Sequence, residues 1–273
     1  MGGKTVLEKL FNRYNIADFS VVSFQHLNTF DVFSKQRIPQ NCKSAIVVIF
    51  PYYNKNTYGG NISAYCSVDD YHIVVMAQLK SIISELECSY PEYKFVPFTD
   101  ASPIDEVDMA VKGGLGVKGE NSLLITEKWG SFVFIGEILT DMPLETVLFD
   151  EKSCVKCGRC QKACPGKAIN DGIIDKEKCA SFISQKKQEL TPQQKDILKK
   201  AKTVFGCDIC QKVCPYNSDI LKNGTEDNVL FKDVLATVTQ ENVEKVYKQR
   251  AFGFRGLKVL KRNLEIYSED ETV

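Results

Sequence analysis

The first 53 residues combine one amphipathic segment with two short apolar runs. Apolar residues at helical spacing predict a short helix near residues 5–14, and ADFSVVSF (17–24) is typical of a strand. The run SAIVVIFPYY (44–53) is almost wholly apolar and is bounded by Pro51, which predicts a buried strand. The chain is therefore expected to begin with a helix followed by two strands.

Helical and strand periodicities continue to alternate up to about residue 148. Residues 69–87 carry apolar side chains at helical spacing, with Asp69 or Asp70 as a possible N-cap, and DEVDMAVKGG (105–114) predicts a short helix closed by glycine. Three segments predict strands, the last two around a turn at 128–130: YKFVPF (93–98), NSLLIT (121–126) and SFVFIGEIL (131–139). This alternation predicts a mixed α/β layer structure, so the expected fold class of the whole chain is α+β.

Composition changes after this region. Residues 151–214 contain 14 Lys and Arg against 7 Asp and Glu, and they hold eight of the eleven cysteines. The remainder of the chain predicts helices, and FRGLKVLKRNLEI (254–266) is a basic amphipathic segment that we expect to pack on the core. We therefore expect an α/β domain over 1–148, a cysteine-rich domain over 149–218 and a helical segment over 219–273.

Charge and apolar runs restrict the class of protein. Lys plus Arg and Asp plus Glu both number 35, so the formal net charge is zero, whereas proteins that grip a phosphate backbone are usually basic. The N-terminus lacks the long apolar core of a signal peptide, and the longest apolar run is too short to span a bilayer. These features predict a soluble cytoplasmic protein with no membrane contact. In that reducing compartment, clustered cysteines hold metal more often than disulfides.

The cysteine-rich region has the spacing of a bacterial two-cluster ferredoxin. Cys154, Cys157, Cys160 and Cys164, followed by proline, form the C-x2-C-x2-C-x3-C-P run, in which the fourth cysteine binds the other cluster. A second run, with Cys207, Cys210 and Cys214 before Pro215, lacks its first cysteine, and Cys179 is the candidate nearby. The crossed rule predicts two [4Fe–4S] clusters, one held by Cys154, Cys157, Cys160 and Cys214, the other by Cys164, Cys179, Cys207 and Cys210.

Two other uses of these cysteines are less consistent with the spacing. Zinc sites usually contain two CxxC pairs and do not need this run, and disulfides are unexpected without a secretory signal. Cys42, Cys66 and Cys88 are scattered, and we expect them to be ordinary thiols. A two-cluster module could be the whole function of an electron carrier, but about 150 residues precede it here and need another purpose.

Motifs upstream of the cysteines resemble the epoxyqueuosine reductase family, which is related to the reductive dehalogenases. The resemblance spans about residues 40–217 and is carried by ISAYCSVDDYH (62–72), FVPFTDASPIDE (95–106), GGLGVKGENSLLI (113–125), GSFVFIGEILTDMPL (130–144) and GCDICQKVCPYN (206–217). The resemblance implies reduction of the epoxide of epoxyqueuosine in tRNA, with electrons passing through two [4Fe–4S] clusters to cobalamin bound between the N-terminal and cluster domains.

The resemblance also implies site residues. The proposed proton donor of the family falls on Asp100, where partial desolvation would raise the pKa of the carboxyl towards neutrality. Asp100 could instead cap the following helix. Gly114, Gly116 and Gly119 would let the backbone approach the corrin closely. Tyr71 and His72 would contact cofactor or substrate, with a structural role at the helix start as the alternative for His72.

The sequence departs from the family in one motif and leaves other functions open. Val117, Lys118, Glu120 and Ser122 replace positions of the usual GLGWIGKNT, and the chain contains only the beginning of the family's C-terminal helical-repeat domain. The alternatives are a small-molecule reductase of the same superfamily, or an electron-transfer or corrinoid-reducing protein without its own substrate. The expected partners are an external donor of the flavodoxin or ferredoxin type and tRNA, and we expect a monomer.

Overall fold

A four-stranded sheet organises the N-terminal half of the chain. The structure is a computed structural model, and it describes residues 2–16, 18–30, 33–150, 152–225, 230–231 and 233–269. The strand order is β1–β2–β6–β3, and each neighbouring pair is antiparallel. The strands are β1 (Phe19–Ser23), β2 (Ser44–Pro51), β3 (Phe95–Phe98) and β6 (Val133–Thr140). All four overlap segments that the sequence predicts as strands, and β3 ends at Phe98, before Asp100.

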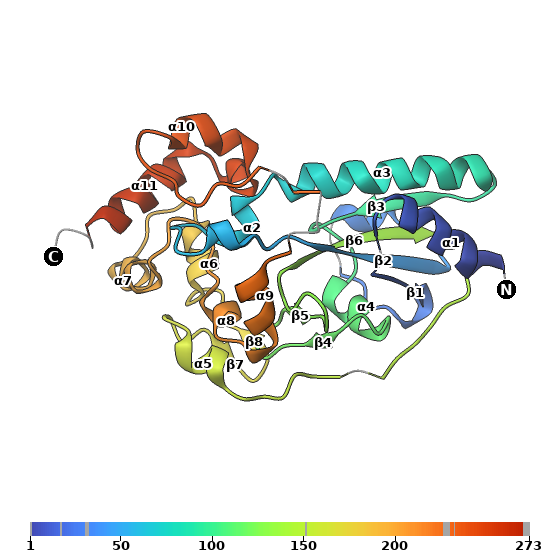
Figure 1. Ribbon diagram of the computed structural model, residues 1–273, viewed down its shortest axis with the longest axis horizontal. Coiled ribbons are helices and arrows are strands. Elements are labelled where there is room, and N and C mark those ends of the chain that lie inside the picture. The colour runs from blue at the N-terminus through green and yellow to red at the C-terminus, as the bar shows by residue number, and fades with distance from the viewer. Residues whose placement is uncertain are drawn as a thin grey trace.

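Both faces of this sheet are covered, which explains why β2 is apolar along its whole length. Side chains of β2 alternate between a core shared with α1 and α3 and a second core shared with α4. Figure 1 shows α3 running along one face and α4 on the other. The helices are α1 (Gly2–Arg13), α3 (Tyr71–Ser89) and α4 (Glu106–Lys112). A short hairpin of β4 (Val117–Lys118) and β5 (Leu124–Ile125) follows α4.

The cysteine-rich region consists of short elements joined by tight turns. It contains α5 (Arg159–Ala163), β7 (Ile169–Asn170), β8 (Ile173–Ile174) and α8 (Ile209–Lys212), followed by α9 (Ser218–Asn223). The lysine-rich stretch between the two cysteine runs forms α6 (Ala180–Ser184) and α7 (Pro192–Ala201). Thr191 and Gln194 form a capping box at the start of α7, which places a helix boundary where sequence spacing alone shows only an insertion.

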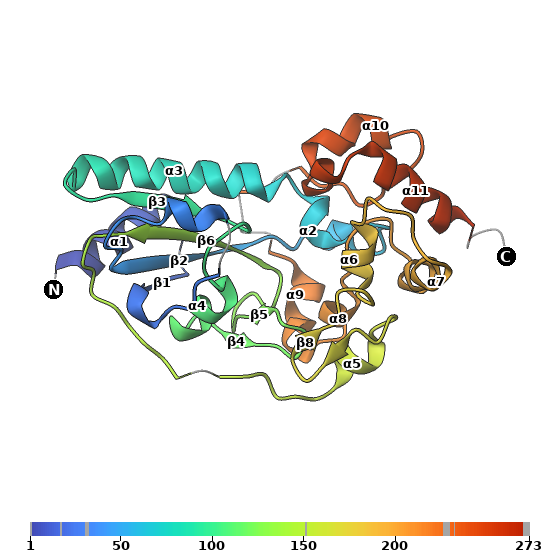
Figure 2. The same cartoon turned by 180° about the vertical axis from the view of Figure 1, so that it is seen from behind.

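The C-terminal helices pack on the cysteine-rich region at the end of the sheet away from the N-terminus, as Figures 1 and 2 show. They are α10 (Val243–Val246) and α11 (Leu257–Ser268), and α11 buries one side against α7. The short helix α2 (Ala64–Ser67) packs into the same core as α10 and α11. Ile62 pairs with Phe205 in a parallel bridge, which joins the N-terminal half to the cysteine-rich region. The domain boundaries at 148 and 218 remain predictions.

None of the helices in the described ranges is long and apolar enough to cross a membrane. The described elements thus form a sheet covered on both faces, a cysteine-rich region of short elements and a group of C-terminal helices.

Candidate functional site

The structure separates the eight clustered cysteines into two sets. Cys154, Cys157, Cys160 and Cys214 line one small pocket. Cys164, Cys179, Cys207 and Cys210 line one end of a much larger cavity of about 500 Å³. These are the two sets that the crossed rule predicts, although Cys164 is a sequence neighbour of the first set. Their role as cluster ligands stays a prediction that this placement supports.

Within the described ranges, no three His, Cys, Asp or Glu side chains are grouped tightly enough to hold a single metal ion. A cubic cluster needs a different arrangement, since its four thiolates stand apart, one on each iron. The described cysteines are also all free of disulfides. The spacing of the thiols around two pockets is consistent with clusters and gives no support to a zinc site.

Asn121, which the sequence analysis did not single out, lies between the two cysteine sets. It lines both the small pocket and the large cavity, and its side chain hydrogen-bonds to Cys210. Its amide oxygen accepts a hydrogen bond of 3.4 Å from the backbone N–H of Leu123. Only the motif GENS, with a polar residue inside a tight turn, hinted at this position, because the cysteines that line the same pockets are 33 to 93 residues away in sequence.

The large cavity extends from the second cysteine set to Asp100. One wall consists of stacked aromatic rings: the ring of Phe134 lies 4.2 Å from that of Tyr71 and 4.3 Å from that of Tyr52. The hairpin that follows α4 forms another wall through residues 121–124. Most of the lining surface is apolar, which suits a large organic ligand better than a hydrated ion.

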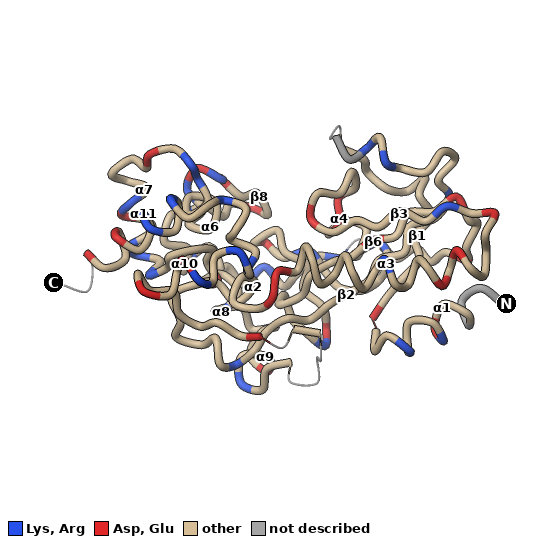
Figure 3. Tube along the Cα trace, turned by 90° about the horizontal axis from the view of Figure 1, so that it is seen from above, with Lys and Arg blue, Asp and Glu red and all other residues tan. Residues whose placement is uncertain are grey.

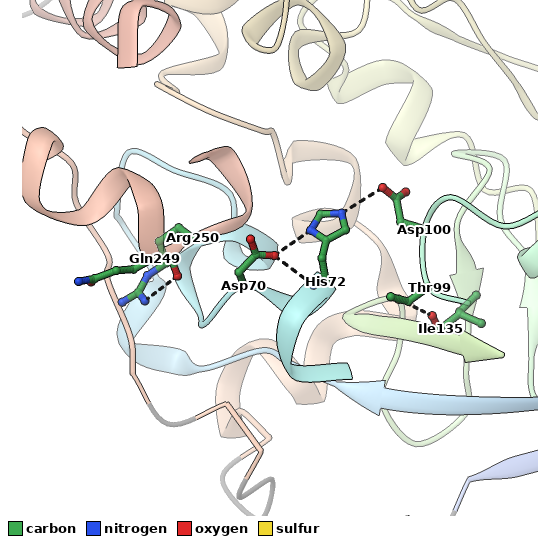
Figure 4. A network of polar contacts seen from close by, with 7 residues as sticks. All are labelled: Asp70, His72, Thr99, Asp100, Ile135, Gln249 and Arg250. Carbon is green, nitrogen blue, oxygen red and sulfur yellow. Dashed lines mark hydrogen bonds and ion pairs between the residues drawn. The ribbon is translucent and has the colours of Figure 1, made fainter. Parts of the chain in front are cut away.

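Asp100, His72 and Asp70 form a chain of polar contacts at this cavity (Figure 4). The Nε2 atom of His72 lies 3.1 Å from Oδ2 of Asp100, and Nδ1 lies 2.7 Å from Oδ1 of Asp70. Asp70 is also the N-cap of α3 and accepts a hydrogen bond from the backbone N–H of His72. Tyr71 lines the cavity and hydrogen-bonds to Asp100. The sequence analysis did not assign Asp70 a place in this group.

The prediction that the pKa of Asp100 would be raised is wrong in this arrangement. The hydrogen bond from His72 lowers the pKa of Asp100, and this effect outweighs the opposing effect of burial. Burial alone would lower the pKa of His72, but its hydrogen bonds to Asp100 and Asp70 raise that pKa to about 9. At neutral pH the histidine is therefore the protonated member of the pair, and Asp100 is its carboxylate partner.

Asp100 does not cap the helix that follows it, so that alternative is also wrong. The N-cap of α4 is Asp105, whose side chain accepts a hydrogen bond from the backbone N–H of Asp108. Asp100 instead stands in a turn with φ of 62°, a left-handed conformation that few residues other than glycine adopt. Its carboxyl is consequently available to the cavity.

The turn that carries Asp100 is fixed from below by strand β6. The Ser102 hydroxyl donates a hydrogen bond to the carboxylate of Glu137, and the Thr99 hydroxyl donates to the Ile135 carbonyl at 3.1 Å. Glu137 is completely buried, and burial raises its pKa to about 7. These contacts hold the strained turn in place, because two buried polar groups depend on it.

The glycines predicted to contact the corrin have another structural explanation. None of Gly114, Gly116 and Gly119 lines the cavity. A Cβ on Gly116 would lie 2.4 Å from the Ile125 carbonyl oxygen, and a Cβ on Gly119 would lie 2.3 Å from Oδ1 of Asn121. Gly114 has φ of 75° and faces the ring of Phe149. The hairpin thus requires these glycines for its own packing, and their contact with a cofactor stays a prediction.

Comparison with known families identifies the cysteine-rich region and the chain. Residues 153–217 match the family model described as 4Fe-4S double cluster binding domain, which defines the class as an iron–sulfur protein. Residues 34–101 match the model described as Epoxyqueuosine reductase QueG, DUF1730. An epoxyqueuosine reductase from Cyclobacterium marinum is 33% identical over 250 residues, which are 86% of this chain and 79% of the relative. The chain belongs to the epoxyqueuosine reductase family.

Solved structures have the same fold. Epoxyqueuosine reductase from Streptococcus thermophilus superposes with a TM-score of 0.79 at 21% identity, covering 99% of this chain and 82% of that one. An epoxyqueuosine reductase with an epoxyqueuosine-modified tRNA-Tyr stem loop gives 0.75 at 20% identity, covering 98% and 82%. A reductive dehalogenase whose structure suggests a mechanism for B12-dependent dehalogenation gives 0.50 at 15% identity, covering 97% and 36%. The expected fold class and double-cluster domain are confirmed.

Proposed function

We propose that this chain reduces epoxyqueuosine in tRNA, with two [4Fe–4S] clusters as its internal electron path and cobalamin in the large cavity. The observation that carries the proposal is that one cavity joins four cysteine thiols at one end to Asp100 at the other. An electron carrier without a substrate of its own has no need of a large cavity, with carboxyl groups in its wall, beside the inner cluster. By inner cluster we mean the one that Cys164, Cys179, Cys207 and Cys210 would hold. Family membership and the neighbour with an epoxyqueuosine-modified stem loop support this substrate over a small molecule.

The cavity suits a corrinoid by its chemistry. Stacked aromatic rings and the apolar hairpin would hold a flat macrocycle, and the four thiols would place the inner cluster beside it. Apart from those thiols, the described lining residues include no His, Met or Cys that could ligate cobalt from the protein. Bound there, cobalamin supplies low-valent cobalt as the two-electron reductant of the substrate.

Electrons enter, in this proposal, at the small cysteine pocket. Cys157 is exposed, whereas Cys164 in the other set is buried, so the first set is nearer to an external donor. The exposed Val155 and the basic Lys156 directly precede Cys157 in the chain. A small acidic carrier of the flavodoxin or ferredoxin type would fit such a surface.

The chain's own residues hold and deliver a proton. Asp70 keeps His72 charged and fixes the orientation of its ring. His72 shares its proton with Asp100, and of these three residues it is Asp100 that lines the cavity. Tyr71 orients the Asp100 carboxyl through its hydroxyl. Asp100 then passes the proton to the substrate and recovers it from His72. A cytoplasmic location and a monomeric state are part of the same proposal.

The proposal is tested by anaerobic reconstitution with iron, sulfide and cobalamin, followed by an assay on a tRNA stem loop that contains epoxyqueuosine. We expect retained cobalamin, spectra of two [4Fe–4S] clusters and formation of queuosine. Failure to retain cobalamin would remove the cofactor assignment. Lack of turnover with both clusters and cobalamin present would remove the tRNA substrate and favour a small-molecule reductase.

Asp100→Ala examines the catalytic assignment directly. Because the side chain of Asp100 is 58% exposed and does not cap α4, its loss should leave the fold, cluster content and cobalamin content unchanged. Turnover should fall by roughly 100-fold or more, the contribution typical of a general acid. Full turnover in this variant would show that Asp100 is not the proton donor.

A further inference from the structure

Reduction of an epoxide needs more protons than the Asp100–His72 pair holds at one time. Removing the epoxide oxygen as water breaks two C–O bonds, forms a C=C bond and consumes two electrons and two protons. The pair at Asp100 holds one transferable proton, the one on His72. A second acid close to the same cavity would let both protons reach the oxygen without waiting for exchange with solvent.

Glu106 is a second carboxyl in the wall of this cavity. It is the first residue of α4, and it lines the cavity together with Asp100. Asp105 serves as the helix cap, so Glu106 is not occupied by that role. Its carboxyl accepts a hydrogen bond from the backbone N–H of Asp100, which places it next to the turn that carries the first acid.

The two carboxyls have opposite electrostatic surroundings. Asp100 faces a cation, His72. Glu106 forms no ion pair with any Lys, Arg or His of the described residues. This includes Lys176, which lines the same cavity. Glu106 faces Asp100 and Asp105 from its own loop and Glu137 from β6. Tyr71 of α3 also faces it, as a neutral phenol whose pKa is raised by burial. Acidic residues gather along α4 (Figure 3).

This environment favours the neutral form of Glu106. Burial raises its pKa well above the usual range, and the negative charges of Glu137 and Asp100 raise it further. Glu137, behind it, is completely buried and has one carboxyl oxygen without a hydrogen-bond partner. Glu106 itself lines the cavity, so its neutral carboxyl faces the space that a substrate would enter.

We propose that Glu106 is the second proton donor of the reaction, delivering its proton to the same substrate oxygen that Asp100 protonates first. This inference rests on the function proposed above. The oxygen leaves as water with one proton from the Asp100–His72 pair and one from Glu106, and both electrons come from the reduced cofactor. Solvent returns both protons before the next turnover.

Turnover of variants tests the assignment. Glu106→Gln keeps the size and the hydrogen bond from Asp100 but has no acidic proton, so kcat should fall by about 100-fold while KM changes little. Glu106→Asp should recover part of kcat. Glu92→Gln, on an exposed turn far from the cavity, is the matched control and should behave as the wild type. Unchanged kcat in Glu106→Gln, with a wild-type enzyme that is active, would overturn the proposal and leave the proposed function standing.

Chemical rescue separates proton donation from a structural role. Glu106→Ala opens space at the cavity wall, and added formic acid should restore kcat in proportion to the concentration of its neutral form. A residue that only supports the fold would show no such recovery. Absence of rescue, together with loss of cobalamin or clusters from the variant, would assign Glu106 a packing role.

A measurement without substrate keeps the proposal testable even if the proposed substrate is wrong. In the holoenzyme at neutral pH, the infrared band of a neutral carboxylic acid should be present and should lose intensity in Glu106→Gln, but not in Glu92→Gln. An unchanged band would show that Glu106 is ionised and cannot donate. If the band is lost in Glu106→Gln but the wild type does not turn over the tRNA stem loop, Glu106 would still be a neutral acid. Its substrate would then be another epoxide or a halide.

Discussion

Asp70, His72 and Asp100 show how one residue's protonation depends on one partner nearby in sequence and one that is distant. Asp70 and Asp100 hold the imidazole from both sides, at 2.7 and 3.1 Å. Burial destabilises the imidazolium, but the two carboxylates together stabilise it more, which raises the pKa of His72 to about 9. The group that stores the proton and the group that presents it to the cavity are thus different residues.

The pKa of His72 can be measured directly, because the chain contains two histidines. We expect an NMR titration of the ring signals to give a value near 9 for His72, with His26→Gln used to assign the two residues. Asp70→Asn should lower the pKa of His72 because one of its two carboxylate partners becomes neutral. A His72 pKa at the ordinary value of 6.5 in the wild type would contradict the hydrogen-bond chain.

The same shift links protonation to stability. Because the pKa is higher in the folded protein than in the unfolded chain, the stabilisation from His72 is fully present below pH 6.5 and is lost as pH rises through about 9. The free energy of unfolding of the wild type should therefore decline over this interval relative to that of His72→Gln. Equal pH dependence in urea titrations of both proteins would count against a charged His72.

At the scale of elements, the hairpin after α4 forms a wall of the cavity and depends on close backbone packing. Gly116 stands against the carbonyl of Ile125 on the neighbouring strand, and residues 121–124 of the same hairpin line the cavity. The departures of this chain from the family motif fall here, with Val117 and Lys118 in β4. Backbone shape is therefore kept while the side chains differ.

Gly116→Ala should destabilise the protein by about 1–3 kcal/mol, since the added methyl group overlaps a backbone oxygen that cannot move without separating β4 from β5. The loss should be equal in protein with and without cobalamin when thermal unfolding is followed by circular dichroism. A variant of wild-type stability that no longer retains cobalamin would instead support the direct cofactor contact predicted from the sequence.

Local patterns in the sequence predict elements well and polar geometry poorly. Apolar runs locate β2 and β6 because both faces of each strand are buried, and Asp70 is among the predicted caps of α3. The sequence suggested Asp100 as a possible cap of α4, whereas the cap is Asp105, the residue directly before the helix. The direction of the Asp100 pKa depends on His72, 28 residues earlier, and no local pattern carries that contact.

At the scale of the whole molecule, the C-terminal segment helps to hold the site although it contributes no predicted catalytic residue. Arg250 is almost completely buried and forms ion pairs with Asp69 at 3.8 Å and Asp233 at 2.9 Å. Asp69 precedes the cap of α3, so this arginine connects the helices near the C-terminus to the start of the helix that carries His72.

Each of the two cysteine sets combines residues from both cysteine runs, and pairs of substitutions can test this arrangement. Cys164 follows Cys160 by four positions, yet it lies with Cys207 at the large cavity while Cys160 lies at the small pocket. If each set holds one cluster, Cys164→Ala combined with Cys207→Ala should remove one cluster, leaving about four of about eight irons. Cys164→Ala combined with Cys160→Ala should remove both clusters and leave almost no iron.

Electron paramagnetic resonance of the reduced variants, together with iron analysis, distinguishes this crossed arrangement from a sequential one. A sequential arrangement, with 154, 157, 160 and 164 on one cluster, reverses the two outcomes: the 160/164 pair would keep one cluster and the 164/207 pair would lose both. Cys88→Ala, at an exposed cysteine of α3 outside both sets, should keep both clusters and serves as the control. The crossed result would show that the outer and inner clusters are each built from both runs. Folding of the second run would then be required before either cluster can form.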